Sequence, residues 1–117
     1  MADVSTISWS QWLPGRSWRV VATVLEGDEV PVRLPQNGAV LVGSPARPKW
    51  LAFDCPCRSG HRIMANLDAN RYPFWQVVGR KRLSVWPSFD VRREARRCHY
   101  LILQGRTLWV PEKEWSP

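Results

Sequence analysis

The chain has 117 residues, of which 44% are hydrophobic and 23% charged, and this length fits one compact domain. Eight tryptophans exclude disorder throughout, because such large side chains need a folded core to cover them. No apolar run is long enough for a membrane span, and residues 1–10 lack the pattern of a secretory signal, so we expect a cytoplasmic protein.

The basic charge is unevenly distributed along the chain. The formal net charge is +7, and residues 58–106 alone carry 11 basic and three acidic residues. Such a field attracts polyanions or acidic protein surfaces, whatever fold lies beneath it. A basic surface without a specific anionic partner is the alternative.

The first half of the chain predicts a run of short strands after an irregular lead-in at residues 1–16. Residues 17–26 are rich in β-branched side chains, and the turn signal Gly27-Asp28 predicts a hairpin with a shorter partner at 29–34. Pro31 favours an edge position for this partner. Further strands are expected at 39–42, 50–54 and 62–67.

The second half predicts two more hairpins. One joins residues 74–78 to 83–86, and the other joins 100–103 to 106–110. Between them, residues 90–97 could form a short helix or a charged loop. We therefore expect a single domain over 17–110 with a tail at 111–117. Its fold should be mostly β, a small antiparallel sheet or a sandwich or barrel-like domain with little helix. Four tryptophans in or beside these strands are expected in the core: Trp50, Trp75, Trp86 and Trp109.

Cysteine and histidine residues form the most specific pattern. Side chains two residues apart in extended backbone face the same way, so Cys55 and Cys57 can both bind one ion. His61 follows closely, and Cys98 and His99 could complete a zinc site, because zinc favours thiolate and imidazole ligands. Neighbouring strand residues face opposite sides, so Cys98 and His99 can bind one ion together only where the chain bends. The alternative is that the cysteines are small buried hydrophobic residues.

The stretch from residue 50 to 109 resembles a small family of uncharacterised bacterial domains. The family pattern has Cys-Pro-Cys-Gly-Cys-Gly, an apolar strand, a Trp, a Pro-Ser, a Cys-x-Ser-His-aromatic motif, and a closing Gly hairpin with Trp. The matching residues here are Cys55 to Gly60, Ile63 to Leu67, Trp75, Pro87-Ser88, Cys98-His99-Tyr100, Gly105 and Trp109.

The resemblance implies a metal-binding, β-rich domain encoded beside bacterial ubiquitin-like conjugation genes, in what look like defence or mobile-element operons. It implies no established activity. The chain departs from the pattern at two cysteines. Ser59 stands at the third cysteine, and Arg96 stands at the fourth when His99 is matched to the family histidine. Either Cys98 replaces the fourth cysteine as a shifted ligand, or this chain has lost the metal site.

Seven basic residues are candidates for partner binding. Arginine side chains contact phosphate oxygens and stack on bases, so a cluster of them could bind nucleic acid or an acidic protein. The two groups would form one patch if their loops lay at the same end of a sheet. They are Arg80, Lys81 and Arg82 in one loop and Arg92, Arg93, Arg96 and Arg97 in another.

The sequence favours a binding module over an enzyme. No HExxH motif, phosphate-binding glycine loop or nucleophile elbow is present, and no catalytic residue is assigned. We therefore expect a structural-zinc domain that serves as a protein-interaction or accessory module of a bacterial system. The alternatives are a nucleic-acid-binding protein that uses the arginines, and a metal- or cysteine-dependent hydrolase in which Cys57 or Cys98 pairs with His61.

Overall fold

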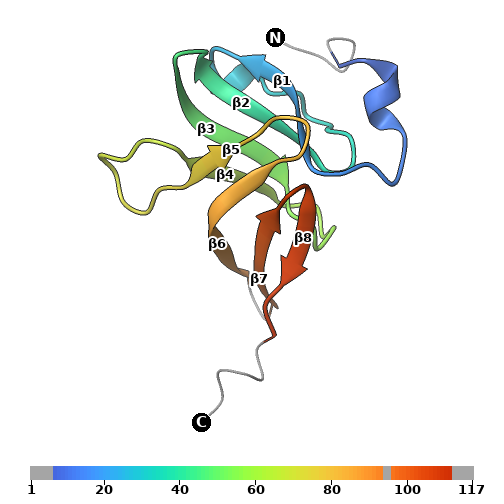
Figure 1. Cartoon of the computed structure of the whole chain (residues 1–117), viewed down its shortest axis with the longest axis vertical. Coiled ribbons are helices and arrows are strands. Elements are labelled where there is room, and N and C mark those ends of the chain that lie inside the picture. Colours follow the sequence, from blue (N-terminus) through green and yellow to red (C-terminus); the bar gives the residue numbers. More distant parts are fainter. Residues whose placement is uncertain (1–6, 94–95, 112–117) are drawn as a thin grey trace.

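The computed structural model describes residues 7–93 and 96–111 and consists of two small four-stranded sheets (Figure 1). The first sheet contains β1 (Arg19–Val24), β2 (Gly38–Ser44), β3 (Arg47–Asp54) and β4 (Arg62–Asn66) in that order. The second contains β5 (Gln76–Val78), β6 (Ser84–Arg93), β7 (Arg96–Leu103) and β8 (Arg106–Trp109), also in chain order. Two short 3-10 turns complete the described part, η2 (Trp9–Trp12) and η3 (Gly27–Glu29). The prediction of a mostly β fold is confirmed. None of the described helical segments is long and apolar enough to cross a membrane.

Strand β2 is buried on both of its faces. Ala39 and Leu41 face the core between the two sheets, whereas Val40 and Val42 face a second cluster on the far side of the first sheet. Ile7 and the segment after β1 cover that second cluster. An uninterrupted apolar run is the sequence pattern of a strand covered on both sides, which explains why β2 lacks a polar face.

The hairpin predicted between residues 17–26 and 29–34 is wrong. Strand β1 pairs in parallel with β2, and residues 25–37 form the crossover that a parallel pair requires. Pro31 and Pro35 lack the backbone N–H of a ladder residue, so this segment forms η3 and irregular structure. Its Leu34 packs onto the second cluster.

The helix considered for residues 90–97 is also absent from the described residues, where β6 and β7 pair as an antiparallel hairpin. Asp90 lies opposite His99, and Val91 lies opposite Cys98. The burial alternates along β7, with Cys98 and Tyr100 buried and His99 between them partly exposed. This two-residue period buries one face of the strand, and a helix would break it.

Aromatic side chains join the two sheets. The ring of Phe53 on β3 lies 5.3 Å from that of Trp18 and 5.2 Å from that of Phe89 on β6, both edge-on. The indole N–H of Trp18 donates to Thr107 Oγ1 at 2.7 Å, so the most buried tryptophan keeps a hydrogen-bond partner.

The predicted tryptophan core is correct only in part. Trp50 and Trp75 are half-buried, but Trp86 and Trp109 are 60% and 51% exposed. The prediction missed Trp18, which is 2% exposed. Bulk alone therefore does not identify the buried indoles, because the face to which each strand position points decides burial.

Replacing the residue that links the sheets tests this core. Phe53→Ala should lower the free energy of unfolding by about 3–5 kcal/mol, because the ring is fully buried and leaves a cavity. Urea unfolding of the full chain measures this. Leu25→Ala is the control, since Leu25 is 65% exposed and its change should stay within about 0.5 kcal/mol. Equal effects of the two substitutions would contradict the described packing.

Candidate functional site

A tight loop after β3 brings two cysteines and a histidine together. The backbone N–H of Cys55 donates to the carbonyl of His61 at 3.0 Å, and the N–H of Arg58 donates to the carbonyl of Cys55, also at 3.0 Å. Gly60 has a φ of +90°, a conformation that glycine adopts without strain. The loop therefore closes on itself, places Cys55 in the core with Cys57 packed against it, and brings His61 beside Cys57.

Cys98 on β7 completes a group of four. One ligand atom from each of Cys55, Cys57, His61 and Cys98 lies within 4.8 Å of the others. The Cys57 Sγ lies 3.7 Å from Nε2 and 3.8 Å from Nδ1 of His61. Tetrahedral zinc, with Zn–S bonds of about 2.3 Å, separates its ligand atoms by about 3.7 Å. This group, which we call the Cys3His group, could hold a metal ion.

The thiols of the Cys3His group differ in acidity. Burial alone would raise the pKa of Cys57, but hydrogen bonds from Ser59, Cys55 and Cys98 together bring the pKa down to about 7. Burial, reinforced by the neighbouring thiols, raises the pKa of Cys98 to about 12, and burial likewise raises the pKa of Cys55. Three thiolates this close repel one another, and a bound cation is the ordinary way to stabilise them together.

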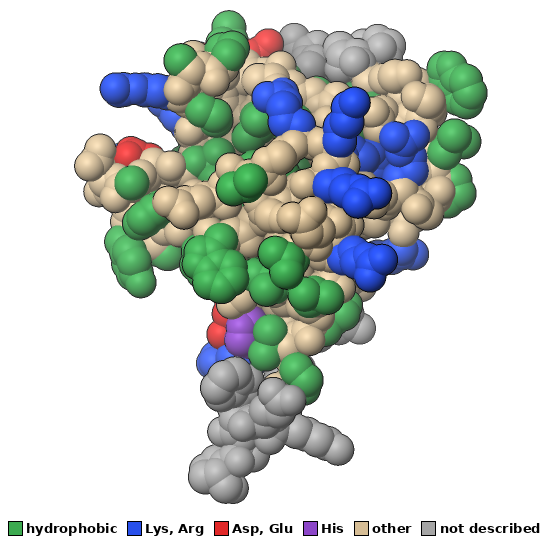
Figure 2. All heavy atoms as spheres, viewed as in Figure 1, with side chains coloured by type: hydrophobic (Ala, Val, Ile, Leu, Met, Phe, Trp, Pro, Cys, Tyr) green, Lys and Arg blue, Asp and Glu red, His purple; other side chains and the backbone are tan. Residues whose placement is uncertain are grey.

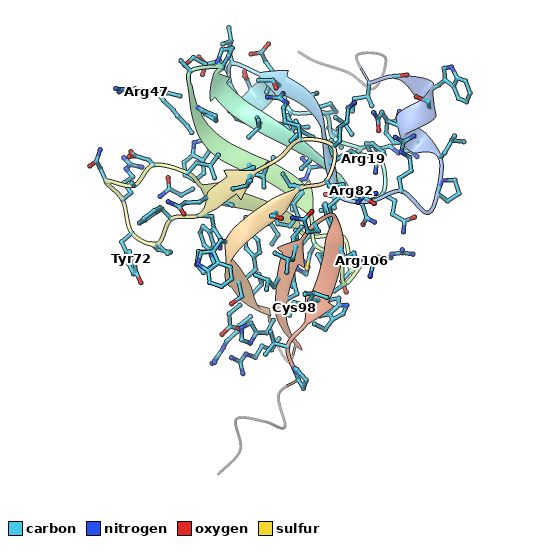
Figure 3. All side chains as sticks on the ribbon, in the orientation of Figure 1. Arg19, Arg47, Tyr72, Arg82, Cys98 and Arg106 are labelled. Carbon is cyan, nitrogen blue, oxygen red and sulfur yellow. The ribbon has the colours of Figure 1, made fainter. Side chains whose placement is uncertain are left out.

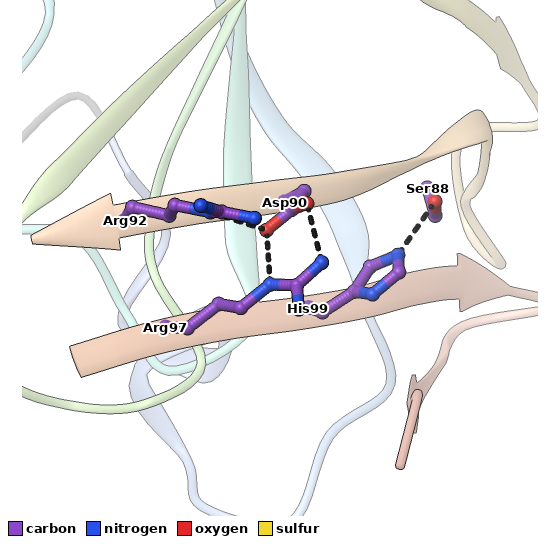
Figure 4. A network of polar contacts seen from close by, with 5 residues as sticks. All are labelled: Ser88, Asp90, Arg92, Arg97 and His99. Atoms are coloured by element: carbon purple, nitrogen blue, oxygen red, sulfur yellow. Dashed lines mark hydrogen bonds and ion pairs between the residues drawn. The ribbon is translucent and has the colours of Figure 1, made fainter. Parts of the chain in front are cut away.

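His99 does not join the Cys3His group. It follows Cys98 on β7, and adjacent strand residues point to opposite faces. The structure thus brings together four of the five predicted ligands, while the His99 ring lies on the outer face. There its Nε2 lies 3.2 Å from Oγ of Ser88 (Figure 4).

An irregularity in β6 presents Ser88 to His99. Val85 pairs with Ile102 and Phe89 with Tyr100, so residues 86–88 form a bulge that faces the single residue Leu101. The Ser88 carbonyl accepts a hydrogen bond from the Trp75 indole at 3.3 Å. Bulges often re-aim side chains next to reactive sites, and this one turns the Ser88 hydroxyl toward an imidazole.

Asp90 adds a negative charge beside this pair. It lies directly opposite His99 in the β6–β7 ladder, and its two carboxylate oxygens each accept a hydrogen bond of 2.8 Å from Arg97 (Figure 4). The Arg97 guanidinium, together with the charges of His99 and Arg92, holds the pKa of Asp90 below its usual range. The Nδ1 atom of His99 is buried and has no hydrogen-bond partner among the described residues.

Both groups of residues lie in a segment that matches a known family. Residues 26–110 match the model of a family described as the bacterial ubiquitination-like system serine protease (BubE). The chain belongs to the BubE family. The match supports the expected association with a bacterial ubiquitin-like conjugation system. Comparisons with curated proteins and with solved structures gave no match.

The described members of the two predicted basic groups of this BubE chain lie at opposite ends of β6. Arg80, Lys81 and Arg82 lie in the loop before the ten-residue strand β6, whereas Arg92 and Arg97 lie near the far end of that strand, where the β6–β7 hairpin turns. Arg92 and Arg97 also form ion pairs with Asp90. The side chains of Arg93 and Arg96 lie outside the described part of the chain. The condition for a single arginine patch, two loops at one end of a sheet, is therefore not met.

Sequence reasoning did not assign Ser88 a role and considered His99 only as a metal ligand. A signal was present, because Pro87-Ser88 and His99 are positions at which the chain resembles the family pattern. Strand alternation at Cys98 and His99 was a second signal, since it allows only one of the two to face the cysteines without a bend. A serine and a histidine 11 residues apart become neighbours only through the strand pairing.

Two histidine variants test the Cys3His group. Chelator-treated protein mixed with zinc should retain about one zinc per chain after gel filtration, measured by elemental analysis. His61→Asn should lower this content strongly, because it removes one of four ligands. His99→Asn is the matched control and should retain zinc, because its ring contacts Ser88 instead. Loss of zinc in His99→Asn alone would contradict this geometry.

Proposed function

We propose that this BubE protein is a serine protease in which Ser88 is the nucleophile and His99 the general base. The observation that carries the proposal is the 3.2 Å distance between Ser88 Oγ and His99 Nε2. A hydroxyl is a weak nucleophile until an adjacent base accepts its proton, and 3.2 Å is short enough for this proton transfer. The family description as a serine protease of a bacterial ubiquitination-like system supports the same chemistry.

The reaction follows from these two atoms. Ser88 Oγ attacks the carbonyl carbon of a peptide bond, and its proton passes to His99 Nε2. The tetrahedral intermediate then breaks the C–N bond, and the imidazolium returns the proton to the departing amine. Water, deprotonated in turn by His99, hydrolyses the acyl ester on Ser88 and restores the hydroxyl.

Asp90 supplies the electrostatic part of the mechanism. His99 becomes positively charged when it takes the serine proton, and the carboxylate opposite it in the ladder stabilises that charge. Arg97 keeps Asp90 ionised through two hydrogen bonds. Asp90 thus acts on His99 through its charge, whereas Ser88 and His99 exchange the proton.

The ion in the Cys3His group is zinc in this proposal, and its role is structural. Three thiolates and one imidazole match the ligands of structural zinc sites, which leave no open position for a substrate. A bound zinc would tie the Cys55–His61 loop to β7 and thereby stabilise the strand that carries His99. The ion would lie on the inner side of β7, opposite to Ser88.

A fluorophosphonate probe, which reacts covalently with activated serines, tests the nucleophile directly. The probe should label the full chain at one site, and mass spectrometry of peptides should locate it at Ser88. His99→Asn should slow labelling by at least about a thousandfold, because the hydroxyl loses its base. Ser88→Ala should abolish labelling.

The matched control for this experiment is Ser44→Ala. Ser44 is the exposed last residue of β2, and its Oγ accepts a hydrogen bond from the backbone N–H of Arg47. Labelling of this variant should equal that of the unmodified chain. Unchanged melting temperatures would show that the variants remain folded. Labelling that survives in Ser88→Ala would overturn the proposal.

A further inference from the structure

The outer surface of the second sheet carries five apolar side chains that nothing in the described chain covers fully. Val78, Trp86, Leu103 and Leu108 are 69%, 60%, 42% and 44% exposed, and Leu101 is half-buried. We call these five residues the outer apolar face. Their strand neighbours Val85 and Ile102 are buried, so the alternation of the strands turns the five outward.

The outer apolar face is continuous with the Ser88–His99 pair. On β7, His99, Leu101 and Leu103 alternate along the same face, and Leu101 lies opposite both Leu108 and the bulge. Trp86 and Ser88 belong to that three-residue bulge. The nucleophile and the largest exposed side chain of the face therefore emerge from one short segment.

The face ends in basic residues that have no ion pair with a described acidic residue. Arg106 lies opposite Leu103 in the β7–β8 ladder. Arg82 is close by, because the N–H of Gly105 donates to the carbonyl of Leu83 at 2.8 Å, and Figure 3 shows both arginines on one side of the molecule. In Figure 2 apolar side chains gather over β6–β8, between basic side chains above and a histidine with charged neighbours below.

We propose that the outer apolar face binds an extended segment of the polypeptide substrate, and that Trp86 and Leu101 select a large apolar residue beside the cleaved bond. This inference rests on the proposed function, because Ser88 must attack a chain that lies on this surface. From His99 to Leu103 the strand spans about 13 Å, the length of about four extended residues. An acidic residue at that distance from the cleaved bond would meet Arg106.

The extent of the outer apolar face and the basic residues at its end both favour an extended polypeptide as the occupant. A single small molecule would leave most of these exposed side chains uncovered, whereas an extended chain can place alternate side chains along them. Apolar side chains would cover Trp86, Leu101 and Leu108, and a carboxylate would pair with the guanidinium at the end of the face. The outer apolar face thus predicts a large apolar substrate residue next to the cleaved bond and an acidic substrate residue farther along the chain.

A peptide library digested by the full chain and analysed by mass spectrometry tests the preference. Leucine, phenylalanine or another large apolar residue should be enriched on one side of the cleaved bonds. Matched peptides with leucine or serine at that position should then differ in kcat/KM by about 10- to 100-fold. Trp86→Ala should reduce this ratio to about threefold or less, chiefly because kcat/KM of the leucine peptide falls.

Trp9→Ala is the matched control, because Trp9 is 77% exposed in η2 and far from β6 in the chain. It should leave the ratio unchanged. Leu108→Ser provides a second test of the same face and should also lower the ratio. Fluorophosphonate labelling of Ser88 should persist in Trp86→Ala, because the probe needs the nucleophile but not the face.

The outcomes separate this inference from the proposed function. One outcome is that the probe labels Ser88 but the leucine-to-serine ratio of kcat/KM is the same in Trp86→Ala and Trp9→Ala. This outcome would overturn the inference and leave the protease proposal standing. Cleavage without an apolar preference would do the same. Absence of both labelling and cleavage would overturn the protease proposal and this inference with it.

Discussion

The alternation of side chains along β7 is the constraint on which both candidate sites depend. Cys98 points inward and joins the Cys3His group, whereas His99 points outward and lies 3.2 Å from the Ser88 hydroxyl. Because neighbouring strand residues cannot share a face, one strand serves a buried site and a surface site within two positions. Under the proposed function, the inner site would stabilise the strand, and the rigidity of the strand would keep the Ser88 hydroxyl and the His99 imidazole in reach of each other.

Local patterns predicted much of the fold. The apolar run of β2, the alternation of β4 and the turn glycine between β7 and β8 all lie where sequence periodicity indicated. The convergence of Cys55 and Cys57 also followed from spacing, because extended residues two apart face the same way. These features depend on a few neighbouring residues, which is the range over which periodicity is informative.

Features that depend on distant pairing could not be predicted in the same way. The parallel partner of β1 is reached only after the crossover at residues 25–37, and no local signal distinguishes it from a hairpin. Trp86 is exposed because it follows the buried Val85 on β6 and therefore points to the outer face of the sheet. The contact between Ser88 and His99 depends on the bulge at residues 86–88 of β6 and on the pairing of β6 with β7, which bring together two residues 11 apart in the chain.

The pleat of β7 also restricts how such a metal site can change during evolution. If His99 is matched to the histidine of the pattern that the chain resembles, Arg96 takes the position of a cysteine, whereas the inward thiol here is Cys98. A move of two positions keeps a ligand on the same side of a strand, whereas a move of one transfers it to the opposite side. A metal-binding position on β7 can therefore move only by an even number of residues if it is to stay on the inner face. An odd shift would place it on the outer face, where Ser88 lies, so the backbone keeps the two sites separate.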